Sequence, residues 1–389
     1  MRHYGGSFCY RLSLWLFFLS ILLLRDRLRI FAGLNYRKLD KIINSLRPSR
    51  IIFPILIGVG VSGWLLYRNF NAEAFSFIEF TWHTLLFLVI AFSMMFVRDV
   101  AYMYRLIILT DSRLSWKQAF NVIMLWEFSS AVSPSVVGGT APAIFFLYKE
   151  GLSGGESTAV VLTAIFLDEV FFILSVPIVY IFYGNNIFPP EAQHYTEIIY
   201  GFYIGFGIIL VYTFFLAYAL FVNPHLFKLF ISWIFLFPLL KKWRTGARKW
   251  ANQLIQTSRV IKKKPFIYWL KSGLATIISW TGRYWVVNFL FMAFFEQSKN
   301  FYDQFLIYGR QLSMWIILLV SPTPGGSGIA EYIFTNFLGD LIPNKVWITT
   351  LAIFWRLISY YPYLFVGVII LPVWIRHVYK KSKKYKVVK

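Results

Sequence analysis

The sequence predicts an all-α polytopic membrane protein with about six full spans and two opposed re-entrant helical hairpins arranged as an inverted repeat. The first observation is composition: 58% of the 389 residues are hydrophobic and 21% are aromatic, and the mean hydropathy is +0.61. The second is a set of apolar runs of membrane-crossing length. The third is a pair of similar proline-glycine breaks inside apolar stretches, which an uninterrupted span does not tolerate.

The apolar runs are long enough to cross a bilayer, which takes about 20 residues. A shorter run, 12–24, is followed by a basic cluster. For residues 1–33, a span, a signal-like segment and an upstream start artefact all stay open. The long runs cover residues 51–67, 82–105, 156–183, 198–222, 266–295 and 346–375.

Basic residues gather in some of the segments between these runs and avoid others. Because basic segments stay on the cytoplasmic side, both termini are predicted to be cytoplasmic. The basic segments are 25–50, 98–117, 228–264 and 380–389, whereas the loops 69–81, 184–197 and 296–300 carry almost no Lys or Arg.

Two interrupted stretches, 118–148 and 301–338, are predicted to enter the membrane and return. By the charge rule each begins and ends on one side, and the two sides are opposite. Their tips should converge near the midplane, where the binding site of a transporter is expected. Two alternatives stay open: ordinary loops at the breaks, or a second stretch made of one full helix plus a short re-entrant one. The breaks consist of Pro134, Gly138 and Gly139 in the first stretch and Pro322, Pro324, Gly325 and Gly326 in the second.

Ionisable residues inside the apolar stretches are the candidate binding residues, because burying a charge in a bilayer is costly. Arginines suit a phosphate, which they bind through a bidentate fork, and acids suit a cationic substituent or a proton. Structural ion pairing is the alternative. Under either reading, Arg283 and Arg356 should lie near an acid rather than face lipid. The candidates are Glu127, Asp168, Glu169, Lys271, Arg283, Arg310, Glu331 and Arg356.

Other functional classes lack their usual residues in this sequence. The net charge is +22, and the basic residues responsible for it lie in segments between apolar runs. A nucleic-acid-binding protein would instead carry them on the basic face of a soluble domain. Cys9 is the only cysteine and the five histidines lie far apart, so no disulfide, metal site or cofactor is expected. Segment 224–264 alternates aromatic and basic residues, which favours either a helix in the cytoplasmic interface or a plain basic loop.

The stretch Pro322–Glu331 reads Pro-Thr-Pro-Gly-Gly-Ser-Gly-Ile-Ala-Glu. Together with the early stretch Glu127–Gly139 and with Arg356, it resembles the transmembrane, flippase-like domain of bacterial lysylphosphatidylglycerol synthases over residues 45–375. The resemblance implies a lipid-translocating protein. Two departures matter. The family usually places an arginine close before the acid where this chain has an apolar pair before Asp168, and no soluble aminoacyl-transferase domain follows, so aminoacylation is not expected.

These observations and the resemblance together predict a lipid flippase or transporter that is not an enzyme. It is expected to move an aminoacylated, glycosylated or polyprenyl-linked lipid between the leaflets of a bacterial inner membrane. Two alternatives stay open: a membrane-embedded enzyme acting on lipid head groups, and a non-transporting scaffold for a lipid synthase or glycosyltransferase. The expected partners are membrane lipids with anionic or aminoacylated head groups, and a homodimer is left open. The predicted division is a basic segment 1–50, a transmembrane domain 51–375 and a polybasic tail 376–389.

Overall fold

The computed structural model describes residues 81–387, apart from 134–138, 191–194, 227–228, 230–243, 296–299, 320–328 and 344. The predictions for residues 1–80, including the span 51–67, lie outside this part. Within it every regular element is a helix, as the all-α prediction requires. The elements are α5 (Trp82–Leu109), α6 (Trp116–Val132), α7 (Thr140–Glu150), α8 (Gly154–Tyr183), η2 (Gly184–Ile187), α9 (Tyr195–Ala217), η3 (Tyr218–Val222), α11 (Arg244–Lys262), α12 (Phe266–Phe294), α13 (Phe301–Leu318), α14 (Ile329–Leu338), η6 (Gly339–Leu341), α15 (Lys345–Ser359) and α16 (Tyr361–Val387).

Four helical segments of the described chain are long and apolar enough to cross a membrane: Trp82–Leu109, Gly154–Ile187, Tyr195–Val222 and Thr350–Val378. They coincide with four of the predicted spans, and the chain is a multi-pass membrane protein. The predicted span 266–295 is also one continuous helix, α12, which has 29 residues and is not one of these four. At about 1.5 Å per residue, α12 is still long enough to cross a hydrocarbon layer of ~30 Å.

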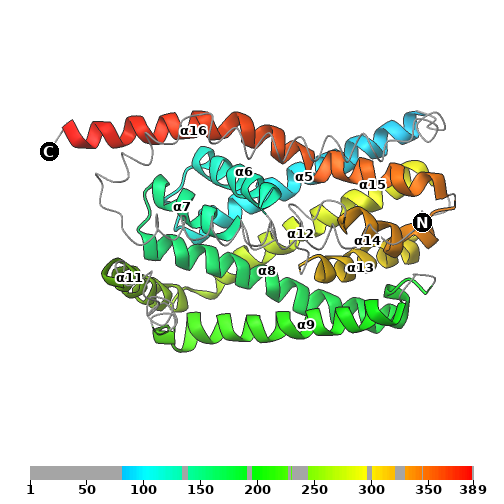
Figure 1. Cartoon of the computed structure of the whole chain (residues 1–389), viewed down its shortest axis with the longest axis horizontal. Helices are drawn as coiled ribbons and strands as arrows, with labels where there is room; N and C mark the ends of the chain where they lie inside the picture. The colour runs from blue at the N-terminus through cyan, green and yellow to red at the C-terminus, as the bar shows by residue number, and fades with distance from the viewer. Residues whose placement is uncertain are drawn as a thin grey trace, which may run out of the picture.

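The last predicted span, 346–375, is two helices rather than one. α15 ends at Ser359 and α16 begins at Tyr361, and Figure 1 shows them following one another along one edge of the bundle. Pro362 accounts for the break, because proline has no N–H for the helix ladder and its ring would clash with the carbonyl group four residues before it in a continuous helix. α16 continues to Val387, through most of the stretch predicted as a polybasic tail.

Two antiparallel helix pairs enter the bundle from opposite ends (Figure 1), which is the opposed arrangement that the sequence predicted. α6 and α7 have 17 and 11 residues, and α13 and α14 have 18 and 10. Each pair thus combines a long inward helix with a short returning one. At about 1.5 Å per residue, α13 falls short of the ~30 Å hydrocarbon thickness, which favours a hairpin over a full span. The tips, 134–138 and 320–328, lie outside the described residues.

The first helix of each pair begins at a polar capping residue. The Ser115 hydroxyl accepts from the Gln118 N–H, and the Gln118 side chain accepts from the Ser115 N–H, which is a capping box at the start of α6. The Asn300 side chain accepts from the Asp303 N–H at the start of α13. These caps satisfy N–H groups that the helix leaves unpaired and so fix where each helix starts.

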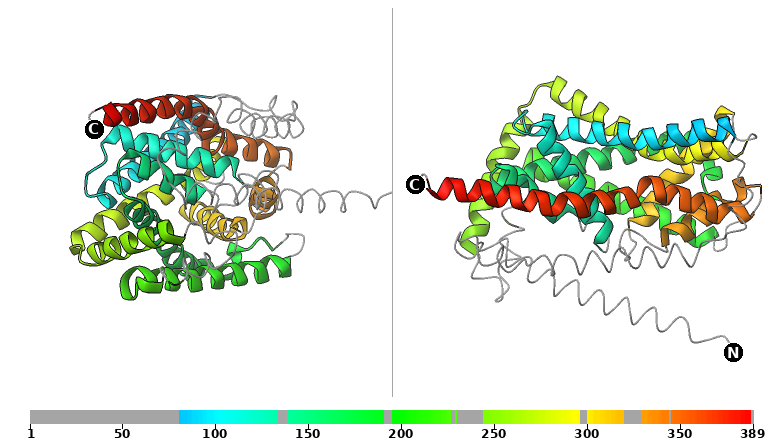
Figure 2. Two further views of the ribbon diagram at one scale, coloured as in Figure 1. Left: turned by 60° about the vertical axis from the view of Figure 1, so that its left-hand side comes forward. Right: turned by 90° about the horizontal axis from the view of Figure 1, so that it is seen from above.

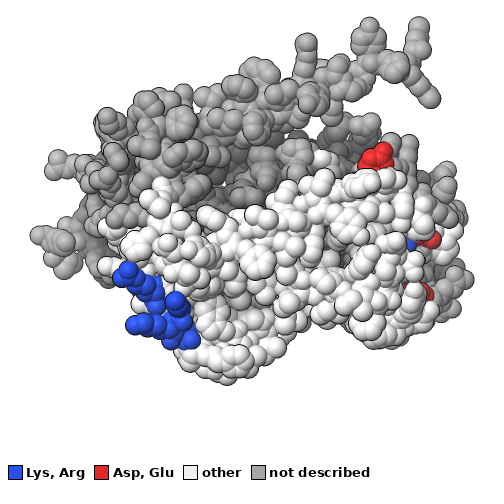
Figure 3. All heavy atoms as spheres, turned by 90° about the horizontal axis from the view of Figure 1, so that it is seen from below, with Lys and Arg blue, Asp and Glu red and all other residues white. Residues whose placement is uncertain are grey.

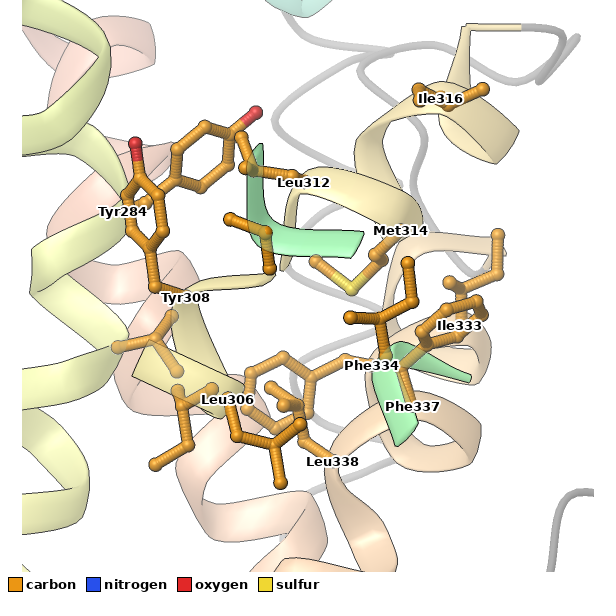
Figure 4. Close-up of a cluster of buried hydrophobic side chains, with 14 of the residues drawn as sticks. Tyr284, Leu306, Tyr308, Leu312, Met314, Ile316, Ile333, Phe334, Phe337 and Leu338 are labelled. Carbon is orange, nitrogen blue, oxygen red and sulfur yellow. The ribbon is translucent and has the colours of Figure 1, made fainter. Parts of the chain in front are cut away.

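Two apolar cores hold the two helix pairs, and α12 contributes to both. One contains buried side chains of α5, α6, α7 and α16. The other contains side chains of α8, α13 and α14, and Figure 4 shows Leu306, Phe334 and Phe337 within it. α5 and α12 form the most extensive contact among the described elements and lie side by side in Figure 2. They approach closely at Gly282, where a Cβ would lie 3.1 Å from the Met94 carbonyl oxygen.

α11 packs its apolar side against other helices of the protein. Leu254 and Ile261 are buried among apolar residues of α8, α9 and η3. Arg259 and Lys262 are exposed, and Figure 3 shows Lys and Arg gathered at one end of the described surface, with acids at the other. The interfacial reading of the wider segment stays a prediction for residues 230–243, which lie outside the described part.

We predict that Gly155→Ala weakens the docking of α11 on α8. A Cβ at this position would lie 2.3 Å from the Gln253 Cβ and 2.4 Å from the Leu254 backbone nitrogen. The two helices must therefore separate, at a cost of about 1–3 kcal/mol. The measurement is thermal unfolding in detergent, combined with protease accessibility of α11.

Gly207→Ala in α9 is the matched control for this variant. Nothing lies within 4 Å of a Cβ at Gly207, and alanine is favoured over glycine inside a helix by roughly 0.5–1 kcal/mol. This control should therefore be neutral or stabilising. An unchanged Tm for Gly155→Ala would contradict the close packing of α8 and α11.

Candidate functional site

A cavity of about 290 Å³ lies where the inner ends of the two helix pairs meet. α6 and α7 contribute Trp126, Glu127 and Thr140, and α13 and α14 contribute Gln311 and Ala330. The rest of the wall comes from α5, α8, α9, α12, α15 and the start of α16. Two stretches far apart in the sequence thus share one concave site with mixed apolar and polar walls, which is the usual character of a ligand site.

Arg98 of α5 is completely buried and joins three helices behind the cavity wall. Its Nη2 donates to Glu127 Oε1 of α6 at 2.5 Å, and its Nη1 donates to Asp99 Oδ1 and to the Tyr363 hydroxyl of α16, both at 2.7 Å. The Arg98 side chain is 0% exposed. A buried guanidinium is tolerated only with such partners, because removing one leaves an uncompensated charge.

Asp168 of α8 is held by side chains of α5 and α12. Arg105 donates to both carboxylate oxygens, at 2.5 and 3.3 Å, and Trp280 Nε1 donates to Oδ1 at 2.7 Å. Arg105 also donates to the Thr276 hydroxyl at 3.0 Å. A two-pronged arginine–carboxylate pair fixes geometry as well as charge. This cluster therefore sets how α8 faces the α5–α12 pair.

Arg283 of α12 is the most exposed of the arginines that line the cavity. Its side chain is 32% exposed, against 5% for Arg105 and 7% for Arg356. Its Nη1 lies 3.8 Å from Glu127 Oε2, beyond hydrogen-bonding distance, and its guanidinium carbon lies 5.7 Å from the centre of the Trp280 ring. Arg283 therefore keeps donors available for an anion that enters the cavity.

Arg356 of α15 pairs with Glu331 of α14, and its Nε donates to Glu331 Oε1 at 2.8 Å. Arg356 lines the cavity, whereas Glu331 is not among the lining residues. Arg283 in turn lies 3.8 Å from Glu127. These two pairs confirm the prediction that both arginines lie beside acids rather than facing lipid.

Besides Glu331, two of the predicted candidates do not line the cavity. Arg310 forms an ion pair with Asp340 and donates to the carbonyl oxygens of Asn186 and Phe337 at 3.1 and 2.9 Å. It thereby ties α13 to η2, α14 and η6. Lys271 is exposed on α12 and is not a lining residue. The structure gives Arg310 a structural contact, whereas the sequence suggested a binding role.

Glu169 of α8 lines the cavity and is 8% exposed. Its Oε2 is buried without a hydrogen-bond partner among the described residues. The adjacent Asp168 already takes both Arg105 and the Trp280 N–H. In the described part of the cavity, Glu169 is therefore an acid that lacks a basic partner.

The structure places only one residue of the two proline-glycine breaks. Gly139 precedes α7 and faces α6, where a Cβ would lie 1.9 Å from Ser130 Oγ and 3.1 Å from the Trp126 ring. Glycine allows this close approach of the two helices. The other break residues lie outside the described part, and their binding roles stay predictions: Pro134, Gly138, Pro322, Pro324, Gly325 and Gly326.

Sequence reasoning missed Arg98 and Arg105. The positive-inside rule assigns 98–117 to a cytoplasmic segment, but α5 continues to Leu109 and buries both arginines. A signal was present, because Arg98, Tyr102 and Arg105 have the spacing of one helix face. The sequence lacks the arginine that the family usually places close before the acid of this span. In the structure, Arg105 of α5 pairs with Asp168 of α8 instead, so the arginine comes from another helix.

Comparison with known proteins points to the same kind of molecule. Residues 51–367 match the sequence model of a family described as the lysylphosphatidylglycerol synthase TM region. Over 307 residues the chain is 25% identical to a UPF0104 membrane protein of Archaeoglobus fulgidus, an alignment that covers 75% of this chain and 89% of the relative. No solved structure matches the chain.

We predict that Arg105→Ala lowers the stability of the folded protein by about 3–5 kcal/mol, because it leaves the half-buried Asp168 carboxylate without its cation. The double variant Arg105→Ala/Asp168→Ala should regain part of that loss, since it also removes the uncompensated charge. The measurement is thermal unfolding of the single and double variants in the same detergent.

Arg113→Ala serves as the control for an exposed ion pair. Arg113 lies 3.1 Å from Glu156 and its side chain is 50% exposed, so its loss should change stability by at most about 1 kcal/mol. Equal destabilisation by Arg105→Ala and Arg113→Ala would show that burial does not strengthen the Arg105–Asp168 pair.

Proposed function

Because the chain belongs to the lysylphosphatidylglycerol synthase TM region family, we propose that it is a lipid transporter that moves a polar-headed lipid between the two leaflets of a membrane. One observation carries the proposal: Arg283 stays 32% exposed inside a cavity shared by two opposed helix pairs. Interrupted helices that meet in this way form the substrate sites of many secondary transporters. A cluster with a purely structural role has no need to hold a guanidinium open to a cavity.

The cavity suits the polar head of a lipid. Arg283 offers a fork of donors to a phosphate, and Trp126, Trp315 and Trp355 supply large apolar walls. A volume of about 290 Å³ is of head-group size. The acyl chains would stay outside, beside the exposed apolar side chains of the membrane-crossing helices.

The proposal is transport rather than catalysis. Glu127 and Asp168, the acids that a general acid–base mechanism would use, are both engaged by arginines. The proposed cargo is an anionic lipid or one with an aminoacylated, glycosylated or polyprenyl-linked head group, supplied by a separate synthase or glycosyltransferase. The proposed location is a bacterial inner membrane with both termini in the cytoplasm, since the basic end of the surface in Figure 3 suits the cytoplasmic side.

The test is leaflet exchange of a fluorescent phosphatidylglycerol in proteoliposomes, read by chemical quenching of the outer leaflet. The wild-type protein should exchange the probe. We predict that Arg283→Gln slows exchange about tenfold or more, because the phosphate loses its cation; tenfold corresponds to about 1.4 kcal/mol. Arg283→Lys keeps the positive charge but loses the bidentate donor geometry of the guanidinium. Its exchange rate should therefore lie between those of the wild type and Arg283→Gln.

Arg259→Gln is the matched control, because it makes the same change at an exposed arginine of α11. Size-exclusion chromatography of each variant checks folding. Wild-type exchange no faster than in protein-free vesicles would refute transport. Wild-type exchange by Arg283→Gln would instead remove Arg283 from the binding site.

A further inference from the structure

Glu169 is the cavity acid that the arginine network leaves out. Glu127 is held by Arg98 and Asp168 by Arg105, whereas Glu169 is 8% exposed and its Oε2 has no partner among the described residues. An unpaired charge at membrane depth is energetically costly. Protonation removes that charge, and the cavity gives the carboxyl group a route to water.

We propose that Glu169 is a proton-binding site and that lipid movement is coupled to proton transfer through the cavity; this inference rests on the proposed transport function. One proton from the water on one side adds to a carboxylate oxygen of Glu169. The same proton later leaves to the water on the other side, so no bond of the lipid changes and nothing is oxidised or reduced.

Among the described residues, each arginine on the cavity wall lies beside an acid other than Glu169. α8 packs against α5, α7, α9, α11, α12, α13 and η2. α5 and α12 each contribute one arginine to the cavity wall. Arg105 of α5 is bound to Asp168, and Arg283 of α12 lies beside Glu127. α7 and α13 add only neutral residues to the cavity, and α11 and η2 add none. The remaining titratable or charged residues on its wall are Tyr102, Tyr212, Tyr284, Arg356, Tyr360 and Tyr363.

Protonation of Glu169 and binding of an anion at Arg283 favour each other. Both groups line the same cavity, where the low dielectric strengthens charge interactions. Adding a proton removes one negative charge from the wall, so an anionic head group binds better. Losing the proton restores that charge and favours release. Protonation of Glu169 thus raises the affinity of Arg283 for the anionic head group, and deprotonation lowers it.

Proton binding is tested first, without reference to lipid movement. Infrared difference spectra between acidic and alkaline pH are recorded on the protein in vesicles of phosphatidylcholine and phosphatidylglycerol. The wild type should show a titrating carboxyl C=O band that Glu169→Gln lacks. Glu197→Gln, the same change at an exposed acid of α9, should keep the band, and Glu169→Asp should shift it. Identical spectra for Glu169→Gln and the wild type would overturn the proton site.

Coupling is tested by exchange of fluorescent phosphatidylglycerol with and without an imposed pH gradient. Wild-type exchange should be several-fold faster with the gradient than after nigericin collapses it. Glu169→Gln should exchange at one rate in both conditions, because glutamine mimics the protonated acid and cannot release a proton. Glu169→Asp should keep a gradient response, which separates loss of titration from loss of folding.

The outcomes distinguish this inference from the transport proposal beneath it. Wild-type exchange that ignores the gradient would overturn the coupling and leave transport standing. A gradient response that survives in Glu169→Gln would place the proton elsewhere. A wild-type protein that moves no lipid in either condition would refute transport and the coupling together, while the infrared band still decides whether Glu169 binds a proton.

Discussion

The rest of the structure depends on one constraint: a guanidinium buried in a membrane protein must meet a carboxylate inside the protein. α5 carries two such groups, and each takes its acid from a different helix. Arg98 pairs with Glu127 of α6, and Arg105 pairs with Asp168 of α8. Apolar packing is non-directional, so these directional contacts fix the rotation of α6 and α8 about α5. The Trp280 N–H then ties α12 to the same point.

Each of the two helix pairs has an acid that pairs with an arginine of a neighbouring helix, but the acid precedes the break in one pair and follows it in the other. In the first pair an acid before the break, Glu127, is held by Arg98 of a neighbouring helix. In the second an acid after the break, Glu331, is held by Arg356 of a neighbouring helix. The two apolar cores do not include these acid–arginine ion pairs, and each core surrounds one of the two hairpins. The polar layer and its cavity are therefore left at the junction of the two hairpins, where their inner ends meet.

Local patterns were enough to predict most of the architecture. Apolar runs and proline-glycine breaks are properties of short stretches, so four spans, the opposed helix pairs and the acids beside Arg283 and Arg356 followed from them. Arg98 and Arg105 did not follow, because a rule that counts basic residues per segment ignores the helix face that carries them. The contacts of Arg310, near the middle of α13, depend on tertiary packing between distant segments, which no local pattern contains.

Paired and unpaired charges have different uses in such a cavity. A ligand that displaced Arg105 from Asp168 would leave a buried charge uncompensated, so the tight pairs serve as walls and are poor binding groups. Arg283 and Glu169 can meet an anion or a proton without breaking a strong pair. Linkage makes their affinities reciprocal: the factor by which protonation strengthens anion binding is the factor by which the anion strengthens proton binding. A transport cycle gains direction only from such a difference, because a ligand with equal affinity for two states shifts neither of them.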